Sequence, residues 1–320
     1  MLKIVDGSLE KKMQKFVIKT GSFAILVFAI VWLVGMADNL DRFSSTNSNI
    51  LRLRLAARQD SLDILFIGNS YAYSAIMPSA FDSLGLRTFN LGTATAGPLF
   101  YRIILEDYFN NSVQNPKIVA MTISPTTFSH LSDNFESYPI HRYLQMPLLN
   151  EAIAIEQNSP TLYYALFQKS AKKAIGNLTS NEPPRQHALT ITEKGFFPDS
   201  QVFNDSVYRE TAFFYHALKQ DHFDREKSNR LIELAHDLEA REIKVVFIEV
   251  PTNRLSDFLS PKFLEEYQNF KRGLRSRFNT VSYPLDLQSR YYRNIDHMNA
   301  KGAAVFSEFI TNEPALVKNE

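Results

Sequence analysis

Short apolar segments alternate with longer amphipathic segments along most of this 320-residue chain. The apolar segments are rich in Val, Ile, Leu and Phe, as expected of parallel strands that are buried on both faces. Strands and helices that alternate at this spacing favour βαβ units with right-handed crossovers. We therefore predict an α/β fold, a three-layer sandwich around a parallel central sheet. The predicted strands are Asp63–Gly68, Thr88–Leu91, Lys117–Ile123, Lys244–Val250 and Thr280–Leu285. The predicted helices are Pro78–Leu84, Leu99–Phe109, Arg225–Arg241, Lys262–Phe278 and Asn299–Thr311.

The alternation breaks between about residues 130 and 225. This part contains a Pro-rich turn at Glu182–Pro184 and an aromatic segment, Lys194–Asp205, that has no clear period. Long segments without a regular pattern are often functional loops. We interpret this part as an insertion in a domain that spans residues 61–320, either a lid over a substrate groove or a docking surface.

The N-terminal region contains one uncharged apolar stretch, Gly21–Ala37. At about 1.5 Å per residue, and with the lysine before it reaching to the interface, this stretch is just long enough to cross a hydrocarbon core. Acidic residues, Asp38 and Asp41, follow it, whereas lysines precede it. Because positive charge favours the cytoplasmic side, we predict a cytoplasmic tail (1–20), a transmembrane anchor (21–37), a stalk (38–60) and a domain outside the cytoplasm. The lysines are Lys3, Lys11, Lys12, Lys15 and Lys19.

A cleaved signal peptide is the alternative interpretation of this stretch. Gly35 and Ala37 form the small-x-small pattern of a cleavage site. The apolar run is longer than the hydrophobic region of a typical signal peptide, and Trp32 near its outer end suits a membrane interface. We therefore favour a single-pass anchor in the cell membrane.

Composition excludes several classes of function. The 35 basic and 34 acidic residues leave a formal charge of +1, so no long-range field favours nucleic acid. The chain has no cysteine, which excludes disulfides, thiolate metal sites and a cysteine nucleophile. The seven histidines show no spacing typical of metal ligands, so we predict neither a metal nor another cofactor.

Candidate catalytic residues follow the predicted strands. In an open parallel sheet, ligands bind beyond the carboxyl ends of the strands. Ser70 lies in the turn after the first strand, Gly92 follows the second, and a polar turn with Thr126 follows the third. His297, next to Asp296, lies between the last strand and the last helix, from which it can meet the end of the first strand. A serine and a histidine brought together in this way are typical of nucleophilic catalysis.

Four segments together resemble the membrane-anchored SGNH (GDSL-like) hydrolases of bacterial envelopes, close to the DltD-like and alginate-acetylation-like branches. The segments are FIGNSYAYSAIMP, FNLG, KIVAMTISPTTF and IDHMNAKGAAVF, and the match spans most of residues 62–128 and 227–312. The resemblance implies an SGNH hydrolase-like, flavodoxin-like fold. It also implies an ester hydrolase or O-acyltransferase that acts beside a membrane-bound O-acyltransferase.

The resemblance implies a role for each candidate residue. Ser70 would be the nucleophile and His297 its base, while Asp296, or alternatively Asn294, would orient the imidazole. The oxyanion hole would consist of the amides of Ser70 and Gly92, with Thr126 at the position of the third donor. The chain departs from the family in that Asn69 and Asn294 stand where Asp is usual, and Thr126 stands where the family has Asn.

The sequence thus predicts a membrane-anchored serine esterase or O-acyltransferase that acts on a cell-envelope polysaccharide or a teichoic-acid-like acceptor. Its further partners would be a membrane-bound O-acyltransferase and the lipid around the anchor, with no nucleic acid. The departures from the family keep open a non-catalytic accessory protein that binds the same polymer or acyltransferase. A membrane-tethered lipase is disfavoured, because no long apolar lid is evident.

Overall fold

The computed structural model describes residues 13–23, 55–59, 61–133, 194–284 and 286–317. The chain divides into two compact units. One unit, Ser48–Asn158 with His187–Glu320, holds the sheet and its helices. The other unit, Met1–Asn47 with Ser159–Gln186, has residues 13–23 as its described part.

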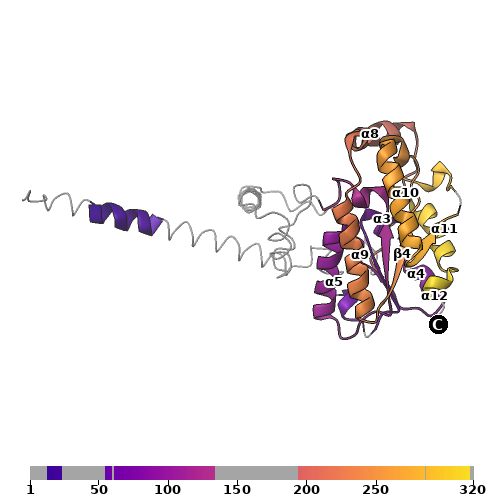
Figure 1. Cartoon of the computed structure of the whole chain (residues 1–320), viewed down its shortest axis with the longest axis horizontal. Coiled ribbons are helices and arrows are strands. Elements are labelled where there is room, and N and C mark those ends of the chain that lie inside the picture. The colour runs from indigo at the N-terminus through magenta and orange to yellow at the C-terminus, as the bar shows by residue number, and fades with distance from the viewer. Residues whose placement is uncertain (1–12, 24–54, 60, 134–193, 285, 318–320) are drawn as a thin grey trace, which may run out of the picture. The chain divides into compact units, whose positions relative to one another are not determined.

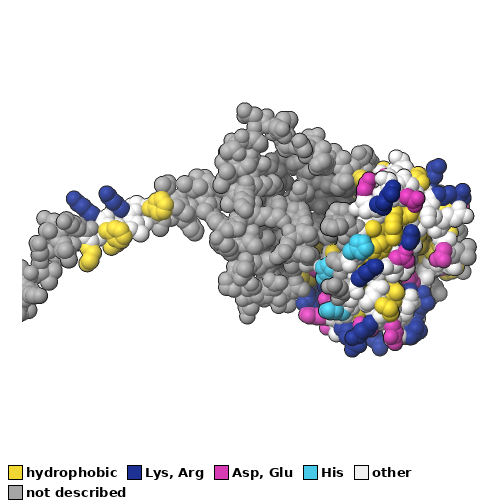
Figure 2. Space-filling model, turned by 90° about the horizontal axis from the view of Figure 1, so that it is seen from above, with side chains coloured by type: hydrophobic (Ala, Val, Ile, Leu, Met, Phe, Trp, Pro, Cys, Tyr) yellow, Lys and Arg dark blue, Asp and Glu magenta, His cyan; other side chains and the backbone are white. Residues whose placement is uncertain are grey.

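Residues 13–23 form a helix with exposed side chains, and Figure 2 shows both lysine and apolar side chains on it. Of the predicted anchor at 21–37, residues 24–37 lie outside the described residues. Within the described ranges, no helix combines the length and the apolar character that a membrane crossing requires.

The sheet has five parallel strands in the order β2-β1-β3-β4-β5, which confirms the predicted α/β fold with a parallel central sheet. Each strand lies within or one residue beyond the segment predicted for it, because strands buried on both faces are continuous apolar runs in the sequence. The strands are β1 (Ile64–Ile67), β2 (Thr88–Asn90), β3 (Ile118–Ile123), β4 (Lys244–Glu249) and β5 (Asn279–Ser282).

The strand order changes direction between β1 and β3. From β1 the chain moves to β2 on one side, whereas β3 and the later strands extend to the other side. Strands β1 and β3 pair in parallel from Ile64 with Ile118 to Ile67 with Met121, so their carboxyl ends lie next to each other. Such a switch point leaves a crevice outside the carboxyl ends of the two strands, where ligands of open α/β sheets bind.

Helices cover both faces of the sheet (Figure 1). α5 and α9 pack together on one side, and α11 packs with α3 and α4 on the other. Helices α3, α8 and α12 were not predicted from the sequence, and α3 and α12 are too short to show an apolar period. The helices of the sheet unit are α3 (Ser70–Ala75), α4 (Ser79–Asp82), α5 (Pro98–Asn111), α8 (Asp205–Tyr215), α9 (Arg225–Ala240), α10 (Pro261–Arg275), α11 (Ala300–Ile310) and α12 (Pro314–Val317). Short 3-10 turns are η1 (Pro125–Phe128), η3 (His216–Gln220), η4 (Leu255–Phe258) and η5 (Ser289–Tyr291).

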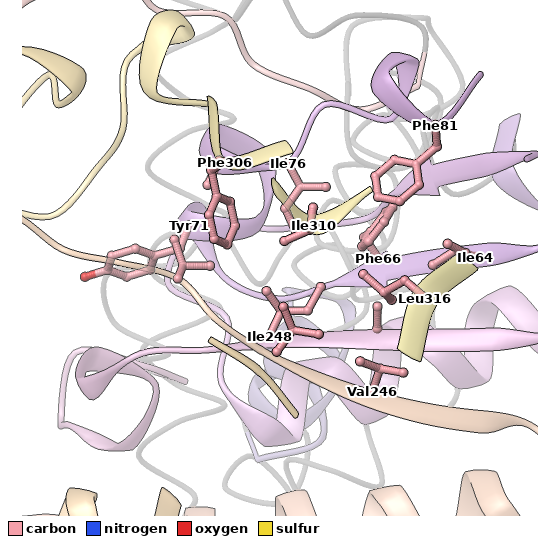
Figure 3. Packing of buried hydrophobic residues seen from close by; sticks show 14 of the residues in the cluster. Ile64, Phe66, Tyr71, Ile76, Phe81, Val246, Ile248, Phe306, Ile310 and Leu316 are labelled. Atoms are coloured by element: carbon pink, nitrogen blue, oxygen red, sulfur yellow. The ribbon is translucent and has the colours of Figure 1, made fainter. Parts of the chain in front are cut away.

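The alternation of side chains along the strands divides the core into two layers. Phe66 of β1 and Ile248 of β4 belong to the layer that packs against α3, α4, α11 and α12 (Figure 3). Their neighbours along the strands, such as Ile67 and Phe247, are equally buried on the opposite face. Because both faces are apolar, burial on both sides stabilises the sheet.

Polar side chains cap the helices and satisfy the amides of their first turns. Asp133, which follows β3 and η1, is buried and accepts hydrogen bonds from the first amides of α5, with a shortest distance of 2.7 Å, from Gly97. Burial raises the pKa of Asp133 to about 6, although Lys227 and these amides act against the rise. The caps formed by a residue just before its own helix are Asn69 for α3, Asn204 for α8, Asp224 for α9, Ser260 for α10 and Asn299 for α11.

Gly68 marks the point at which β1 ends and the chain turns into α3. A Cβ atom at this position would lie 1.8 Å from Thr122 Oγ1 and 2.9 Å from the Cβ of Ala72. Thr122 Oγ1 is buried and forms no hydrogen bond with any described residue. The absence of a side chain at Gly68 therefore lets the turn lie directly against β3.

We expect Gly68→Ala to lower the free energy of unfolding by about 1–3 kcal/mol or more, because the added methyl group overpacks the junction of β1 and β3. Adding Thr122→Ala removes the nearest atom and should restore part of the loss. The matched control is Gly273→Ala in α10, where a Cβ meets nothing within 4 Å, and it should stabilise by about 0.5–1 kcal/mol. Urea unfolding followed by circular dichroism measures all variants. A Gly68→Ala protein as stable as the wild type would show that the junction is not tightly packed.

Candidate active site

Ser70 is the first residue of α3, immediately beyond the end of β1. The side chain of Asn69 caps this helix, and its Oδ1 accepts a hydrogen bond from the Tyr71 amide at 3.0 Å. The Ala72 amide donates to the Asn69 carbonyl at 3.1 Å. The hydrogen bonds of the described residues leave the Ser70 amide unused. An amide at the start of a helix is a suitable donor for a developing negative charge.

The structure brings Ser70 and His297 together, although 227 positions separate them in the sequence. His297 Nε2 lies 2.6 Å from Ser70 Oγ, within hydrogen-bond distance. His297 belongs to a tight loop, closed by an antiparallel bridge between Tyr292 and Met298 and by a 2.9 Å hydrogen bond from the Arg293 amide to the His297 carbonyl. The loop ends at Asn299, which caps α11. The imidazole is therefore held by a fixed backbone.

Two acceptors surround the other imidazole nitrogen. Asn294 Oδ1 lies 3.2 Å from His297 Nδ1 in hydrogen-bonding geometry. Asp296 Oδ1 lies closer, at 2.5 Å, but it makes no aligned hydrogen bond and therefore lies away from the N–H direction. Since both neighbours are acceptors, Nδ1 carries the proton of the neutral ring, and Nε2 is left to accept from the Ser70 hydroxyl.

Asn294 also shapes the loop that carries His297. Its Oδ1 accepts hydrogen bonds from the backbone amides of His297, at 2.7 Å, and Asp296, at 3.2 Å. The same oxygen therefore holds both the loop backbone and the ring. Asn294 and Asp296 were alternative predictions for the orienting residue, and the geometry places both beside Nδ1.

Asp296 is a buried carboxylate, only 2% exposed. Burial alone would raise the pKa of this carboxyl. The charge of the neighbouring imidazole and the donors around the carboxylate outweigh burial and hold the pKa below its usual value. The hydroxyl donors are Tyr71, at 2.8 Å from Oδ2, and Tyr215 of α8. The carboxylate is therefore ionised at neutral pH and able to stabilise a positive charge on His297.

The predicted oxyanion donors lie in different surroundings. The Gly92 amide donates to Asn90 Oδ1 at 2.9 Å, so it must share or release this bond to serve another oxygen. Thr126 is buried in η1, where its hydroxyl lies 3.0 Å from Ser124 Oγ and beside the hydroxyl of Tyr71. Among the described contacts, none joins Thr126 to Ser70. The Ser70 amide is thus the donor with the clearest access.

Asn90, which the sequence analysis missed, links β2 to α3. Its Nδ2 donates to the carbonyls of Ala72 at 2.8 Å and Ile76 at 3.0 Å, while its Oδ1 accepts from Gly92. Asn90 has no exposed surface, and a buried amide needs several partners. An amide side chain at the end of an apolar strand was the available signal. Asn90 therefore holds α3, the short helix that begins at Ser70, against β2.

The described part of the predicted insertion lies alongside the site. The Phe197 amide donates to the Tyr73 carbonyl of α3 at 2.8 Å, and the Ala300 amide donates to the Asp199 carbonyl at 2.6 Å. The Asp199 carboxylate also pairs with Arg293 at 2.8 Å. The aromatic segment predicted at Lys194–Asp205 is thus an extended loop attached to α3, to the histidine loop and to α11.

A cavity of about 550 Å³ opens between the first residues of α9 and α10, with Asp221 and Lys262 in its wall. Neither Ser70 nor His297 lines it.

Within the described ranges, no three His, Asp or Glu side chains are grouped closely enough to hold a metal ion. On the face seen in Figure 2, basic and acidic side chains are interspersed over the described surface. The candidate site is therefore defined by the contacts of Ser70 and His297.

No protein-family model and no curated protein matches this chain. Solved structures give weak similarities. A GDSL-like lipase from Bacteroides thetaiotaomicron is 11% identical, with 78% of this chain and 85% of the lipase covered and a TM-score of 0.37. A carbohydrate acetylesterase family member from Sinorhizobium meliloti is 7% identical, with 80% and 99% covered and a TM-score of 0.34. At these values the similarities assign no function to the chain.

Proposed function

We propose that this protein is a serine ester hydrolase or acyltransferase of the SGNH type. The contact of 2.6 Å between His297 Nε2 and Ser70 Oγ carries the proposal. A serine hydroxyl is a weak nucleophile until a base takes its proton, and this distance allows the transfer. The Ser70 amide and the buried carboxylate of Asp296 supply the two further elements that the reaction needs.

In the proposed reaction, Ser70 Oγ attacks the carbonyl carbon of an ester while its proton passes to His297 Nε2. The carbonyl oxygen becomes negative and accepts a hydrogen bond from the Ser70 amide. The protonated imidazole then gives its proton to the leaving alcohol, and the acyl group stays on Ser70. Water, or a hydroxyl of an acceptor, next gives a proton to His297 and attacks the acyl carbonyl. The bond from this carbon to Ser70 Oγ then breaks, and Oγ takes the proton back from His297, which releases the acid or the new ester.

The first test is ester hydrolysis by the full-length protein in detergent. With p-nitrophenyl acetate, we expect Ser70→Ala to lower kcat/KM at least about 10³-fold, because the nucleophile is lost. Ser74→Ala is the matched control, since Ser74 is buried in the same helix and its hydroxyl, among the described residues, donates to the Tyr71 carbonyl alone, at 3.5 Å. A fluorophosphonate probe should label Ser70 alone. Equal rates for wild type and Ser70→Ala would refute the enzyme proposal and favour a non-catalytic binding protein.

The second test separates the two acceptors at Nδ1. Asp296→Asn should lower kcat by up to about 10⁴-fold, because it removes the charge that stabilises imidazolium and introduces an amide that can favour the wrong tautomer. Adding Asn294→Asp moves a carboxylate to the aligned acceptor position, 3.2 Å from Nδ1. This double variant should regain at least about tenfold, because a hydrogen bond to a charged group contributes about 1.5 kcal/mol or more. Without such a recovery, Asn294 would be a loop residue only.

We further propose that the protein is anchored in the cell membrane with its N-terminus in the cytoplasm. The uncharged stretch at 21–37, with lysines before it and aspartates after it, supports this orientation. The proposed substrate is an acylated envelope polysaccharide or teichoic-acid-like polymer, and a membrane-bound O-acyltransferase is the proposed partner. The location of the domain, rather than any side chain at the site, supports these two assignments.

Protease accessibility tests this orientation. In cells expressing the protein with a C-terminal tag, we expect the full chain to sediment with membranes and its tag to be digested from outside after the outer layers are removed. Deletion of residues 21–37 is the control and should leave the chain in the soluble cytoplasmic fraction. A tag that stays protected in cells with exposed membranes would refute the orientation. A chain shortened at Ala37 would instead indicate a cleaved signal peptide.

A further inference from the structure

Tyr71 contacts both His297, the candidate base, and Asp296, the carboxylate beside it. Its hydroxyl donates to Asp296 Oδ2 at 2.8 Å. Its ring stacks on the imidazole of His297, with the ring centres 5.2 Å apart and the planes 14° from parallel. Because Tyr71 directly follows Ser70 at the start of α3, one short segment carries the nucleophile and contacts both other groups.

The surroundings of Tyr71 leave it little freedom to move. The side chain is 2% exposed, and its ring closes one end of the apolar layer that contains Ile248 and Phe306. Figure 3 shows the hydroxyl pointing away from these apolar side chains. The backbone is fixed too, because the Tyr71 amide donates to Asn69 Oδ1. The Tyr71 ring therefore gives the His297 imidazole a fixed surface to pack against.

The charge state of Tyr71 fits a donor role. Burial, followed by the negative charge of Asp296, raises the pKa of Tyr71 well above its usual value. The hydroxyl stays protonated at every working pH, so it can donate to the carboxylate but cannot act as a base. Tyr215 lies near the same carboxylate, and burial and Asp296 likewise raise its pKa.

We propose that Tyr71 is a positioning residue that holds the imidazole plane of His297 and the carboxylate of Asp296 in line with Ser70. The ring fixes the imidazole by stacking, and the hydroxyl fixes Asp296 Oδ2, which leaves Oδ1 beside Nδ1. This role rests on the proposed ester chemistry of the site. A purely structural tyrosine would need a hydrogen-bond partner as well, so the experiment must separate packing from positioning.

Tyr71→Phe in the full-length protein is the central variant, because it keeps the ring and its stacking and removes only the hydroxyl. We expect kcat for p-nitrophenyl acetate to fall about tenfold to a hundredfold with KM unchanged, since a small misplacement of a catalytic group costs this much. Tyr108→Phe is the matched control. Tyr108 is equally buried, in α5, and its hydroxyl lies near Ser112, at the other end of that helix from the start of α3, so wild-type kinetics are expected.

A readout without substrate keeps this proposal separate from the proposed function. Long-range ¹H–¹⁵N spectra of histidine-labelled protein, assigned with His297→Gln, report which ring nitrogen carries the proton. We expect wild type and Tyr108→Phe to show His297 protonated at Nδ1. Tyr71→Phe should keep this tautomer, because Asn294 Oδ1 still accepts from Nδ1, but its His297 ring signals should shift, because Asp296 loses the donor that holds Oδ2. If the wild type proves to have no esterase activity, the proposed function fails, while these spectra still test the positioning.

Wild-type kcat together with a wild-type imidazole spectrum in Tyr71→Phe would overturn the proposal and make Tyr71 a packing residue. If Tyr71→Phe does not fold, 3-fluorotyrosine at position 71 provides a second variant that keeps the ring and the hydroxyl. The fluorine makes the hydroxyl a stronger donor, so the His297 signals should shift relative to those of the unmodified protein. Unchanged His297 signals in the 3-fluorotyrosine protein would also overturn the proposal.

Discussion

The parallel pairing of β1 with β3 sets the position of every group at the candidate site. The two strands pair from Ile64 with Ile118 to Ile67 with Met121, so their carboxyl ends arrive together at the switch in strand order. The absence of a side chain at Gly68 lets the turn after β1 lie against Thr122. Ser70 then lies in the first turn of α3, just beyond the carboxyl end of β1, and any loosening of this junction would displace the serine relative to the histidine loop.

A buried carboxylate beside the imidazole is costly unless its charge is compensated. At this site the compensation comes from tyrosine hydroxyls, one of which lies 2.8 Å from Asp296 Oδ2, and from His297 itself. Asn294 supplies the aligned acceptor and also holds the loop backbone. In the proposed reaction, tautomer control and charge stabilisation would therefore be divided between two residues, whereas a single aspartate combines them in the usual triad. This division explains how the loop accommodates an aspartate directly adjacent to the histidine.

The sequence was sufficient to predict the strands and the meeting of Ser70 with His297, because apolar runs mark buried strands and parallel strands end at one edge of the sheet. It was not sufficient for α3, whose six residues SYAYSA are too few and too polar to show an apolar period. The contact between Asp296 and His297 Nδ1 depends on the backbone turn that Asn294 stabilises. The spacing of residues in the sequence does not predict this turn. Asn90 and Tyr71 were missed because their partners lie in other elements. The catalytic roles of the predicted residues stay predictions.

Residues of the predicted insertion contribute contacts to the candidate site. Tyr215 of α8 lies beside the carboxylate of Asp296, and the loop before α8 is bonded to α3 through Phe197 and to α11 through Asp199. The surroundings of the buried acid are therefore completed by residues outside the alternating strand and helix pattern. A displacement of α8 and of the loop before it would therefore change the donors around Asp296.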